Sequence, residues 1–338
     1  MNGEETDPRS ETRRPSPSIS LVICTYNRAA TLADALESLL EQTADESVFE
    51  IIVVDNNSTD ETRAVTLSFA ERRRGVRYIL EKSQGLCFAR NAGFRAATSE
   101  WVMYLDDDIH AHRNLVERAL HVIERYGFDC FGGLCLPWYK SGRPRWLHDR
   151  YVINSVDPNI ETGILREGYA MGALVVFRKS ILEELGGFAI EHSRFVGMSK
   201  DRLGYGDETV VQVRMRERGH TIGFDPELRV DHLVQESRMH PMWFLRMRFA
   251  KGRDSWDSFG IEPTVMRLLK RVPFIFLRPL MVLPGNLWRV FTVEDYYAAN
   301  LFIDTLNPVA RLLGEIHGGL AIMRERRKGK DTAGTAGS

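Results

Sequence analysis

The chain has 338 residues, of which 43% are hydrophobic and 27% charged, and its formal net charge is -1. This ordinary globular composition excludes collagen-like, low-complexity and mostly disordered proteins, and the near-zero charge gives no general attraction to nucleic acid. Four cysteines without a Cys-x-x-Cys pair exclude a disulfide framework and a zinc knuckle, and a reducing, cytoplasmic compartment fits them. Residues 1–18 are polar, lack the apolar core of a signal peptide and are expected to form a disordered tail.

The first 126 residues alternate between apolar strands and helices. Continuous apolar runs predict buried strands over residues 19–24, 49–54, 76–80 and 101–105. Helical spacing and capping residues predict helices over about residues 31–40, 59–74, 84–97 and 112–126. This alternation indicates an α/β fold with a doubly wound, mostly parallel sheet that is covered by helices on both faces.

The pattern loosens after Tyr126. Residues 136–168 are rich in Trp, Tyr, Pro and Arg and show no clear period. Later in the chain, strands are predicted over residues 173–177, 222–224 and 228–230, and helices over residues 179–185 and 208–218. From Met239 the chain becomes helical and basic, with 15 Lys and Arg residues against 8 Asp and Glu residues between Arg246 and Lys330. We therefore expect an α/β domain over residues 19–238, a helical region over residues 239–330 and a flexible tail over residues 331–338.

Polar clusters follow three of the predicted strands. Thr25 to Arg28 follow the first strand, Asp55 to Asn57 the second, and Asp106 to Asp108 the fourth. Ligands of doubly wound sheets bind beyond the carboxyl ends of the strands. The three clusters therefore predict a binding site along one rim of the sheet.

The run Asp106-Asp107-Asp108 favours a metal site. Three adjacent carboxylates repel one another unless a cation lies among them. Alternate residues of an extended segment point to the same side, so Asp106 and Asp108 can share a ligand. Hard oxygen ligands suit Mg²⁺ or Mn²⁺, and such an ion can hold a diphosphate. The alternative is a solvated acidic turn.

Other polar residues are ambiguous when each is taken alone. Asp55 can accept hydrogen bonds from a ribose or a base, or it can form an Asx turn. Arg90 can meet a phosphate or form a helical salt bridge. The pair Asp207-Glu208 can supply a general base, or it can complement the dipole of the helix that it opens.

The candidates near the end of the domain are weaker still. His232 is a metal ligand or a structural histidine, and Arg238 binds the donor or is a surface charge. Trp138 and Trp146 can stack on sugar rings or pack in a core.

The order of these motifs resembles family 2 glycosyltransferases of the GT-A fold. The resemblance covers about residues 19–232, and it rests on the segments SLVICTYNRAATLADALESLLEQT, IIVVDNNSTDET, GLCFARNAGFRAATSEWVMYLDDDI, MGALVVFRKSILEELGGF and GYGDETVVQVRMRERGHTIGFDPELRVDH. It implies inverting transfer of a sugar from a nucleotide-diphosphate sugar to a glycan, lipid-linked or other hydroxyl acceptor, with Mn²⁺ or Mg²⁺ as cofactor. Residues 19–126 would then bind the nucleotide-sugar, and residues 127–238 would bind the acceptor.

The resemblance also implies roles for individual residues. Donor binding falls to Thr25, Tyr26, Arg28, Asp55, Asn57, Arg90, Asp106 and Arg238. The metal ligands are Asp108, Asp106 and His232, with Asp107 in the variable middle of the family's Asp-x-Asp motif. Contact with the acceptor is expected at Trp138, Trp146 and Gly206.

The general base is expected at Glu208, with Asp207 as its rival. The family usually has Glu-Asp where this chain has Asp-Glu, and Val210 stands where the family usually has a further acidic residue. These exchanges keep a second reading open, in which the chain is a non-catalytic binder of sugars or nucleotide-sugars on the same fold. A sugar nucleotidyltransferase is a less favoured alternative, because it would need a phosphate-cradling glycine loop after the first strand, and none is there. A nicotinamide dehydrogenase would need a Gly-x-Gly-x-x-Gly motif at the same place, which this chain lacks.

The basic C-terminal region has two interpretations. Its cations interleave with large apolar residues: Arg267, Lys270, Arg271, Arg278 and Arg289 with Leu268, Leu269, Phe274, Phe276, Leu277 and Trp288. This composition is typical of a segment that lies on an anionic membrane surface, and it also fits a helical subdomain that covers the edge of the sheet. Many family members act on lipid-linked or exported glycans, which favours contact with the inner face of the plasma membrane.

Overall fold

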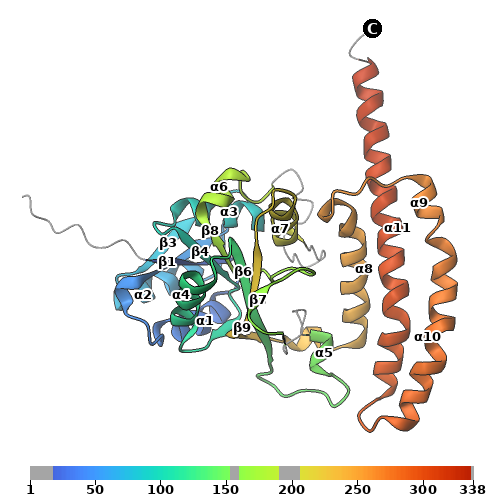
Figure 1. Cartoon of the computed structure of the whole chain (residues 1–338), viewed down its shortest axis with the longest axis horizontal. Coiled ribbons are helices and arrows are strands. Elements are labelled where there is room, and N and C mark those ends of the chain that lie inside the picture. The colour runs from blue at the N-terminus through green and yellow to red at the C-terminus, as the bar shows by residue number, and fades with distance from the viewer. Residues whose placement is uncertain (1–17, 153–159, 190–205, 336–338) are drawn as a thin grey trace, which may run out of the picture.

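The computed structural model describes residues 18–152, 160–189 and 206–335. Its centre is a nine-stranded mixed sheet with the order β3-β2-β1-β4-β8-β6-β9-β5, and β7 pairs with β9 outside this path. Helices cover both faces of the sheet, and four further helices form a separate layer on the side of α7 (Figure 1). This is an α/β fold with a helix-covered sheet, as the sequence predicts. The predicted tail over residues 1–18 lies outside the described residues, except for Ser18.

The first half of the sheet is parallel, as expected. It consists of β1 (Ile19–Thr25), β2 (Phe49–Asp55), β3 (Val76–Leu80) and β4 (Trp101–Leu105). The connecting helices are α1 (Ala29–Leu40), α2 (Thr62–Arg72) and α3 (Leu86–Ala96), and α4 (Leu115–Tyr126) follows β4 and β5. Because β1 and β2 pair in register, Thr25 lies beside Asp55 at the same rim.

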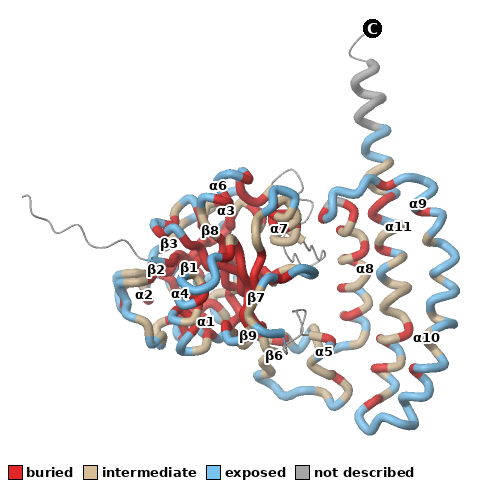
Figure 2. The backbone as a smooth tube through the Cα atoms, viewed as in Figure 1, coloured by how far each residue is buried: buried red, intermediate tan, exposed pale blue. Residues whose placement is uncertain are grey.

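Alternating residues of these strands supply two buried layers. Leu21, Ile51 and Met103 belong to the core on one face, while Val22, Ile52 and Val102 belong to the core on the other. A strand that is covered on both faces must be apolar at every position, which explains the continuous runs seen in the sequence. Figure 2 shows this buried sheet at the centre of the domain.

The second half of the sheet mixes directions. It contains β5 (Ile109–Ala111), β6 (Cys130–Trp138), β7 (Gly163–Ile164), β8 (Leu174–Arg178) and β9 (Ile222–Leu233), with the short helices α5 (Asp149–Val152) and α6 (Lys179–Glu184) and the helix α7 (Asp207–Glu217). Strand β8 runs antiparallel to β4 and β6, whereas β6 and β9 are parallel. The predicted parallel arrangement therefore holds for the first four strands and for the pair of β6 with β9, while β8, β5 and β7 pair antiparallel with their neighbours.

Three element predictions were wrong in detail. Strand β6 was not predicted, because Gly132 and Gly133 interrupt its apolar run. A Cβ at Gly133 would lie 2.0 Å from the carbonyl oxygen of Leu228, so this close pairing excludes a side chain there. The two short strands predicted after residue 221 are one strand, β9, whose register with β6 shifts after Gly133. Helix α2 begins at Thr62, and the predicted cap Thr59 instead donates its backbone N–H to Asn27 Oδ1 over 2.7 Å.

The C-terminal region is helical, as predicted. It comprises α8 (Pro241–Ser258), α9 (Val265–Leu269), α10 (Val272–Thr292) and α11 (Ala298–Thr335). Helix α11 packs between α8 and α10, and α8 contacts α7 of the α/β domain (Figure 1). None of the helices that the structure describes is long and apolar enough to cross a membrane.

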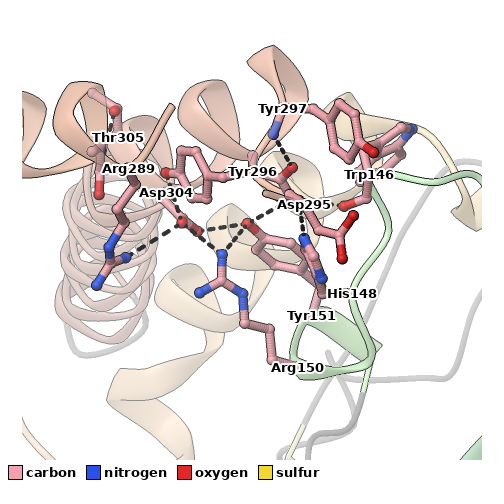
Figure 3. Close-up of polar contacts among 12 residues, drawn as sticks. Trp146, His148, Arg150, Tyr151, Arg289, Asp295, Tyr296, Tyr297, Asp304 and Thr305 are labelled. Atoms are coloured by element: carbon pink, nitrogen blue, oxygen red, sulfur yellow. Dashed lines mark hydrogen bonds and ion pairs between the residues drawn. The ribbon is translucent and has the colours of Figure 1, made fainter. Parts of the chain in front are cut away.

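A polar network joins these helices to α5 and to the residues just before it (Figure 3). Asp304 of α11 accepts hydrogen bonds from Arg150 (3.0 Å), Tyr151 (2.9 Å) and Tyr296 (3.0 Å). Asn300 of α11 donates to the carbonyl oxygen of Trp146 over 2.6 Å. Phe244 and Met247 of α8 complete this contact, because they share a small core with Tyr151 and Val234.

Candidate functional site

The polar ends of β1 and β4 meet at one point of the rim. Thr25 donates a hydrogen bond to Asp107 Oδ2 over 2.7 Å. Arg28, in the turn after β1, contacts Asp107 Oδ1 at 2.7 Å and Asp108 Oδ2 at 2.6 Å. Both carboxylates are almost fully buried, with 5% and 2% of their side-chain surface exposed. Arg28 therefore neutralises part of the acidic run and fixes the direction of both side chains.

The pairing of β5 with β9 brings a histidine to the acidic run. Ile109 lies opposite His232, and the backbone N–H of Leu233 donates to the carbonyl oxygen of Asp108 over 2.9 Å. As a result His232 Nε2 lies 3.1 Å from Asp108 Oδ1 and 3.4 Å from Asp106 Oδ2. One ligand atom from each of Asp106, Asp108 and His232 falls within 4.8 Å of the others.

This group fits a divalent cation. Asp108 Oδ1 is buried and accepts no hydrogen bond of good geometry, so it is available as a metal ligand. Asp106 is 41% exposed on its side chain and can turn toward the same point. Two carboxylates and one imidazole form a donor set suited to Mn²⁺ or Mg²⁺.

Burial and the charges of neighbouring groups shift the pKa values of Asp107, Asp108 and His232. Burial raises the pKa of Asp107 to about 7, although Arg28 and Thr25 favour its charged form. Burial also opposes the charge on Asp108, but His232 and Arg28 outweigh it and lower the pKa of Asp108 below its usual range. Burial alone would lower the pKa of His232, yet Asp106 and Asp108 raise it to about 9.

The end of β2 forms the neighbouring part of the rim. Asp55 is 2% exposed and accepts hydrogen bonds from the Tyr78 hydroxyl and the backbone N–H of Ser58, both over 2.8 Å. Tyr26 is 46% exposed beside it, and Asn57 is exposed with a left-handed φ of 66°. Asp55 is thus held rigidly, while Tyr26 presents an open aromatic surface.

The acidic pair opens helix α7 and lies against Arg90 of α3. Arg90 Nη1 contacts Asp207 Oδ2 directly and lies 3.5 Å from Glu208 Oε2. Asp207 is 8% exposed on its side chain, whereas Glu208 is 23% exposed. Gly172 leaves room for this contact, because a Cβ there would lie 2.5 Å from Arg90 Nη2.

The single guanidinium of Arg90 pairs with both Asp207 and Glu208, and the pKa values of the two carboxylates shift in opposite directions. Burial raises the pKa of Asp207 well above its usual range, and Arg90 offsets only part of this. Burial acts on Glu208 as well, but the hydrogen bond with Asp207 and the charge of Arg90 lower its pKa. The arrangement therefore keeps Glu208 as a partly exposed carboxylate near neutral pH, the state that a general base requires.

The two acidic groups are neighbours in space. The thiol of Cys24 at the end of β1 is buried, and its pKa, which burial raises to about 12, is affected by Arg90, Asp106 and Asp207. Asp106 also acts on Glu208. The charge of Asp106 thus reaches both Cys24 and Glu208, so the cation-binding group and the acidic pair lie within range of an electrostatic interaction.

A small hollow of about 50 Å³ adjoins His232. Arg238 and Trp243 line it, with Cys135 and Met171 on the sheet side. The Arg238 guanidinium lies over the Trp243 ring, 5.8 Å from its centroid, and its charge acts on Asp108. Arg238 is thus close to the cation-binding group, as expected of a donor-binding residue.

The three residues expected at the acceptor are not brought together. Trp138, at the end of β6, lies beside His110 and under the ammonium of Lys140. Trp146 packs edge-on against Phe244 in the small core under α8. Gly206 has a φ of 108°, and a Cβ there would lie 2.3 Å from Ser258 Oγ of α8.

Sequence reasoning missed several residues of the site. Asp107 was expected to be variable, but it anchors both Thr25 and Arg28. Tyr78, which holds Asp55, was treated only as part of a strand. Lys251 of α8 is influenced by Glu208, and burial lowers its pKa to about 8. No signal in the sequence links Lys251 to residues more than 40 positions away.

Comparisons of the sequence with known proteins find glycosyltransferases. Residues 20–186 match the family model described as Glycosyl transferase family 2. Glycosyltransferase AglE of Haloferax volcanii is 27% identical over 173 residues, which cover 51% of this chain and 56% of AglE. Succinoglycan biosynthesis protein ExoM of Rhizobium meliloti is 28% identical over 237 residues, 70% of this chain and 73% of ExoM. The chain thus matches little more than half of the length of AglE.

Solved structures show the same fold. A mannosyltransferase, PcManGT, from Pyrobaculum calidifontis in complex with GDP-Man and Mn²⁺ gives a TM-score of 0.54 at 18% identity, covering 95% of this chain and 80% of that one. TarS 1-349 of S. aureus in complex with UDP gives a TM-score of 0.52 at 16% identity, covering 92% of each chain. Both alignments extend beyond the α/β domain into the C-terminal helices.

Proposed function

Because the chain belongs to the family 2 glycosyltransferases, we propose that it moves a sugar, with inversion, from a nucleotide-diphosphate sugar to a hydroxyl acceptor. One observation carries the proposal: a cation-binding group of Asp106, Asp108 and His232 lies within electrostatic range of a partly exposed carboxylate, Glu208. A transferase of this kind needs both a site for the diphosphate and a base for the acceptor.

The donor is assigned to the rim of the parallel half. Asp55 and Tyr26 would bind the nucleoside, since one offers a fixed acceptor and the other an exposed aromatic ring. Thr25, Arg28, Asn57, Arg90 and Arg238 complete the proposed donor-binding set. A bound Mn²⁺ or Mg²⁺ would neutralise the diphosphate and so stabilise it as a leaving group.

The base is assigned to Glu208. Inverting transfer is one displacement, in which the acceptor oxygen attacks the anomeric carbon as the bond to the diphosphate breaks, and a carboxylate takes the acceptor's proton. Glu208 is the more exposed and the more acidic member of the pair. Asp207, fixed by Arg90, would orient it.

The acceptor is proposed to be a glycan or lipid-linked glycan, made at the inner face of the plasma membrane. Support comes from the printed functions of relatives, which include succinoglycan biosynthesis and poly(ribitol-phosphate) beta-N-acetylglucosaminyl transfer, the latter 25% identical in Staphylococcus aureus. The four cysteines are free, as a reducing cytoplasm requires. Trp138, Trp146 and Gly206 remain the proposed acceptor residues. Trp146 and Gly206 both lie against α8, so this proposal requires an acceptor that extends toward α8.

The test is turnover of nucleotide-sugars by the full chain. Release of nucleoside diphosphate is measured for UDP-, GDP- and TDP-sugars with Mn²⁺, with Mg²⁺ and with EDTA, and the anomeric configuration of any product is read by NMR. The proposal expects one preferred donor, loss of turnover in EDTA and an inverted product. Metal-independent turnover or retention would refute it, and tight donor binding without any turnover would favour the non-catalytic binder.

A further inference from the structure

Helices α9 and α10 carry an unusual concentration of exposed apolar side chains. Of the 26 large apolar residues that are exposed in the described part of the chain, 14 lie between residues 265 and 293. We call this set the α10 face: Val265, Met266, Leu269, Val272, Phe274, Phe276, Leu277, Leu280, Met281, Leu287, Trp288, Val290, Phe291 and Val293. Figure 2 shows α10 as an exposed helix at the edge of the molecule. A soluble surface rarely leaves such a patch uncovered.

The most exposed apolar residues of α10 lie on its outer side. Its inner side packs on α11, where Asn286 is buried and donates a hydrogen bond to Thr305 over 3.2 Å. Leu277, Leu280, Trp288 and Phe291 recur at helical spacing on the opposite side and are 48%, 68%, 69% and 83% exposed. From Leu277 to Phe291 this stripe is about 21 Å long, on a helix of 21 residues that measures about 31 Å.

The same segment is purely cationic. Residues 263–293 contain five Lys and Arg residues and no Asp or Glu. Arg271 turns inward and pairs with Glu315 of α11 at 2.5 Å. Lys270 and Arg278 are exposed, and Arg289 is 50% exposed although it lies 4.0 Å from Asp304. The α10 face is therefore bordered by positive charge along its length, and the exposed acids Glu262, Glu294 and Asp295 lie beyond its ends.

We propose that the α10 face lies on an anionic lipid bilayer, with α10 parallel to the membrane plane. A helix of this kind inserts its apolar side about 5–10 Å into the headgroup region, while Lys and Arg reach the anionic headgroups. Charge decides between this occupant and a second copy of the chain. Self-association would bring two cationic borders together with no acidic residue on the face to compensate them, whereas an anionic membrane satisfies both the charge and the apolar stripe.

This surface is separate from the proposed active site. Helix α8 contacts α7, α11 packs on α8, and α10 packs on the far side of α11 (Figure 1). The proposal does not depend on the proposed catalysis, although a membrane-bound enzyme would meet a lipid-linked acceptor. Changes on the α10 face should therefore leave donor turnover in solution unchanged.

The experiment is co-sedimentation of the full chain with vesicles. Vesicles of phosphatidylcholine alone are compared with vesicles that contain phosphatidylglycerol, at low and high salt. Three variants are tested: Leu280→Ser with Phe291→Ser, Lys270→Gln with Arg278→Gln, and Trp288→Phe. Matched controls change exposed residues of the α/β domain, namely Leu67→Ser with Leu80→Ser and Arg74→Gln with Arg125→Gln.

We expect the wild type to bind only the anionic vesicles and to lose binding at high salt. Each basic residue removed should weaken partitioning about fivefold, because each contributes about one favourable charge contact at the surface. The two serines should reduce partitioning more than tenfold, and both controls should bind normally. Trp288→Phe should bind but lose most of the fluorescence quenching caused by brominated lipids.

Two outcomes would overturn the proposal. The first is a wild type that stays in the supernatant with anionic vesicles at low salt while it remains folded and turns over donor. The second is a concentration-dependent dimer in sedimentation velocity that Leu280→Ser with Phe291→Ser abolishes without any effect of lipid. That second result would assign the α10 face to a second copy of the chain.

Discussion

At the residue scale, Asp107 and Asp108 are neighbours with different environments. Both oxygens of Asp107 are used within the protein, one by Thr25 and the other by Arg28. Asp108 gives one oxygen to Arg28 and leaves the other buried beside His232 without a hydrogen bond of good geometry. This oxygen has only the ion pair with His232, so a divalent cation there would add a second favourable contact to a buried carboxylate.

Exchange of Asp108→Asn should abolish metal-dependent binding of nucleoside diphosphate. The amide removes a charged ligand, and its effect should exceed the roughly 10- to 100-fold loss typical of outer-shell changes. Asp107→Asn is the matched control and should stay within about tenfold of the wild type, because the amide oxygen still accepts from Thr25. Calorimetry with Mn²⁺ and a nucleoside diphosphate measures both. Tight binding by the Asp108 variant in EDTA would contradict the assignment.

A second residue-scale prediction concerns the base. Glu208→Gln should lower turnover by about 10²- to 10⁴-fold, because a general base typically contributes that much. Binding of donor and metal should persist, because the amide still fits beside Arg90. Asp207→Asn should cause the smaller loss in turnover, since it changes only the residue that orients Glu208. Steady-state rates and calorimetry on the same samples separate these effects. Full activity of Glu208→Gln together with an inactive Asp207→Asn would reverse the two roles.

Much of the site follows from where strands end. Asp55 and Asp106 to Asp108 could be predicted because parallel strands deliver their carboxyl ends to one rim. The position of His232 could be inferred only from the family motif, because it depends on the pairing of β5 with β9. The anchoring role of Asp107 depends on Thr25, 82 residues earlier, and no local pattern encodes that contact.

At the scale of elements, glycines allow α8 and α11 to touch backbone to backbone. A Cβ at Gly314 would lie 2.0 Å from the carbonyl oxygen of Phe249, and one at Gly318 would lie 2.1 Å from that of Arg253. A Cβ at Gly252 of α8 would lie 2.1 Å from the carbonyl oxygen of Arg311. The spacing between the two helices is therefore fixed by main chain rather than by side chains.

Gly314→Ala should lower the free energy of unfolding by about 1–3 kcal/mol, because an extra methyl group must push the helices apart. Gly285→Ala on α10 is the control. Nothing lies within 4 Å of a Cβ there, so the better helix propensity of alanine should raise stability by up to about 1 kcal/mol. Chemical denaturation of the full chain measures both changes. Equal effects at the two positions would show that α8 and α11 do not need this close contact.

The same glycines show why some elements escaped prediction. Apolar periodicity identified the four parallel strands, because their residues are buried on both faces. It failed at β6, where Gly132 and Gly133 are required by neighbouring backbone rather than by strand propensity. It divided β9 in two, because Asp225 and Pro226 interrupt an apolar pattern at the register shift.

At the scale of the whole molecule, the C-terminal helices complete the α/β domain. Phe244, Met247 and Trp256 of α8 are at most 3% exposed. Phe244 and Met247 share a core with Tyr151 and Val234, and Ser258 lies against Gly206 at the start of α7. The boundary that composition placed after residue 238 therefore separates residues that pack together.

A chain that ends at residue 238 should consequently fail to fold cooperatively. It would expose the residues of the α/β domain that pack against the large apolar side chains of α8. Burial of one such side chain stabilises a fold by about 1.5–3 kcal/mol, and the free energy of unfolding of a whole domain is only about 5–15 kcal/mol. It would also leave Gly206 and the acidic pair without the cover of α8. A full chain with Arg324→Gln and Arg327→Gln is the control, because both residues are exposed and their exchange should change stability by no more than about 0.5 kcal/mol. Thermal unfolding and binding of a hydrophobic dye compare the two. If the shorter chain unfolds in one sharp transition and still binds donor with Mn²⁺, the α/β domain is autonomous and α8 serves only to carry the α10 face.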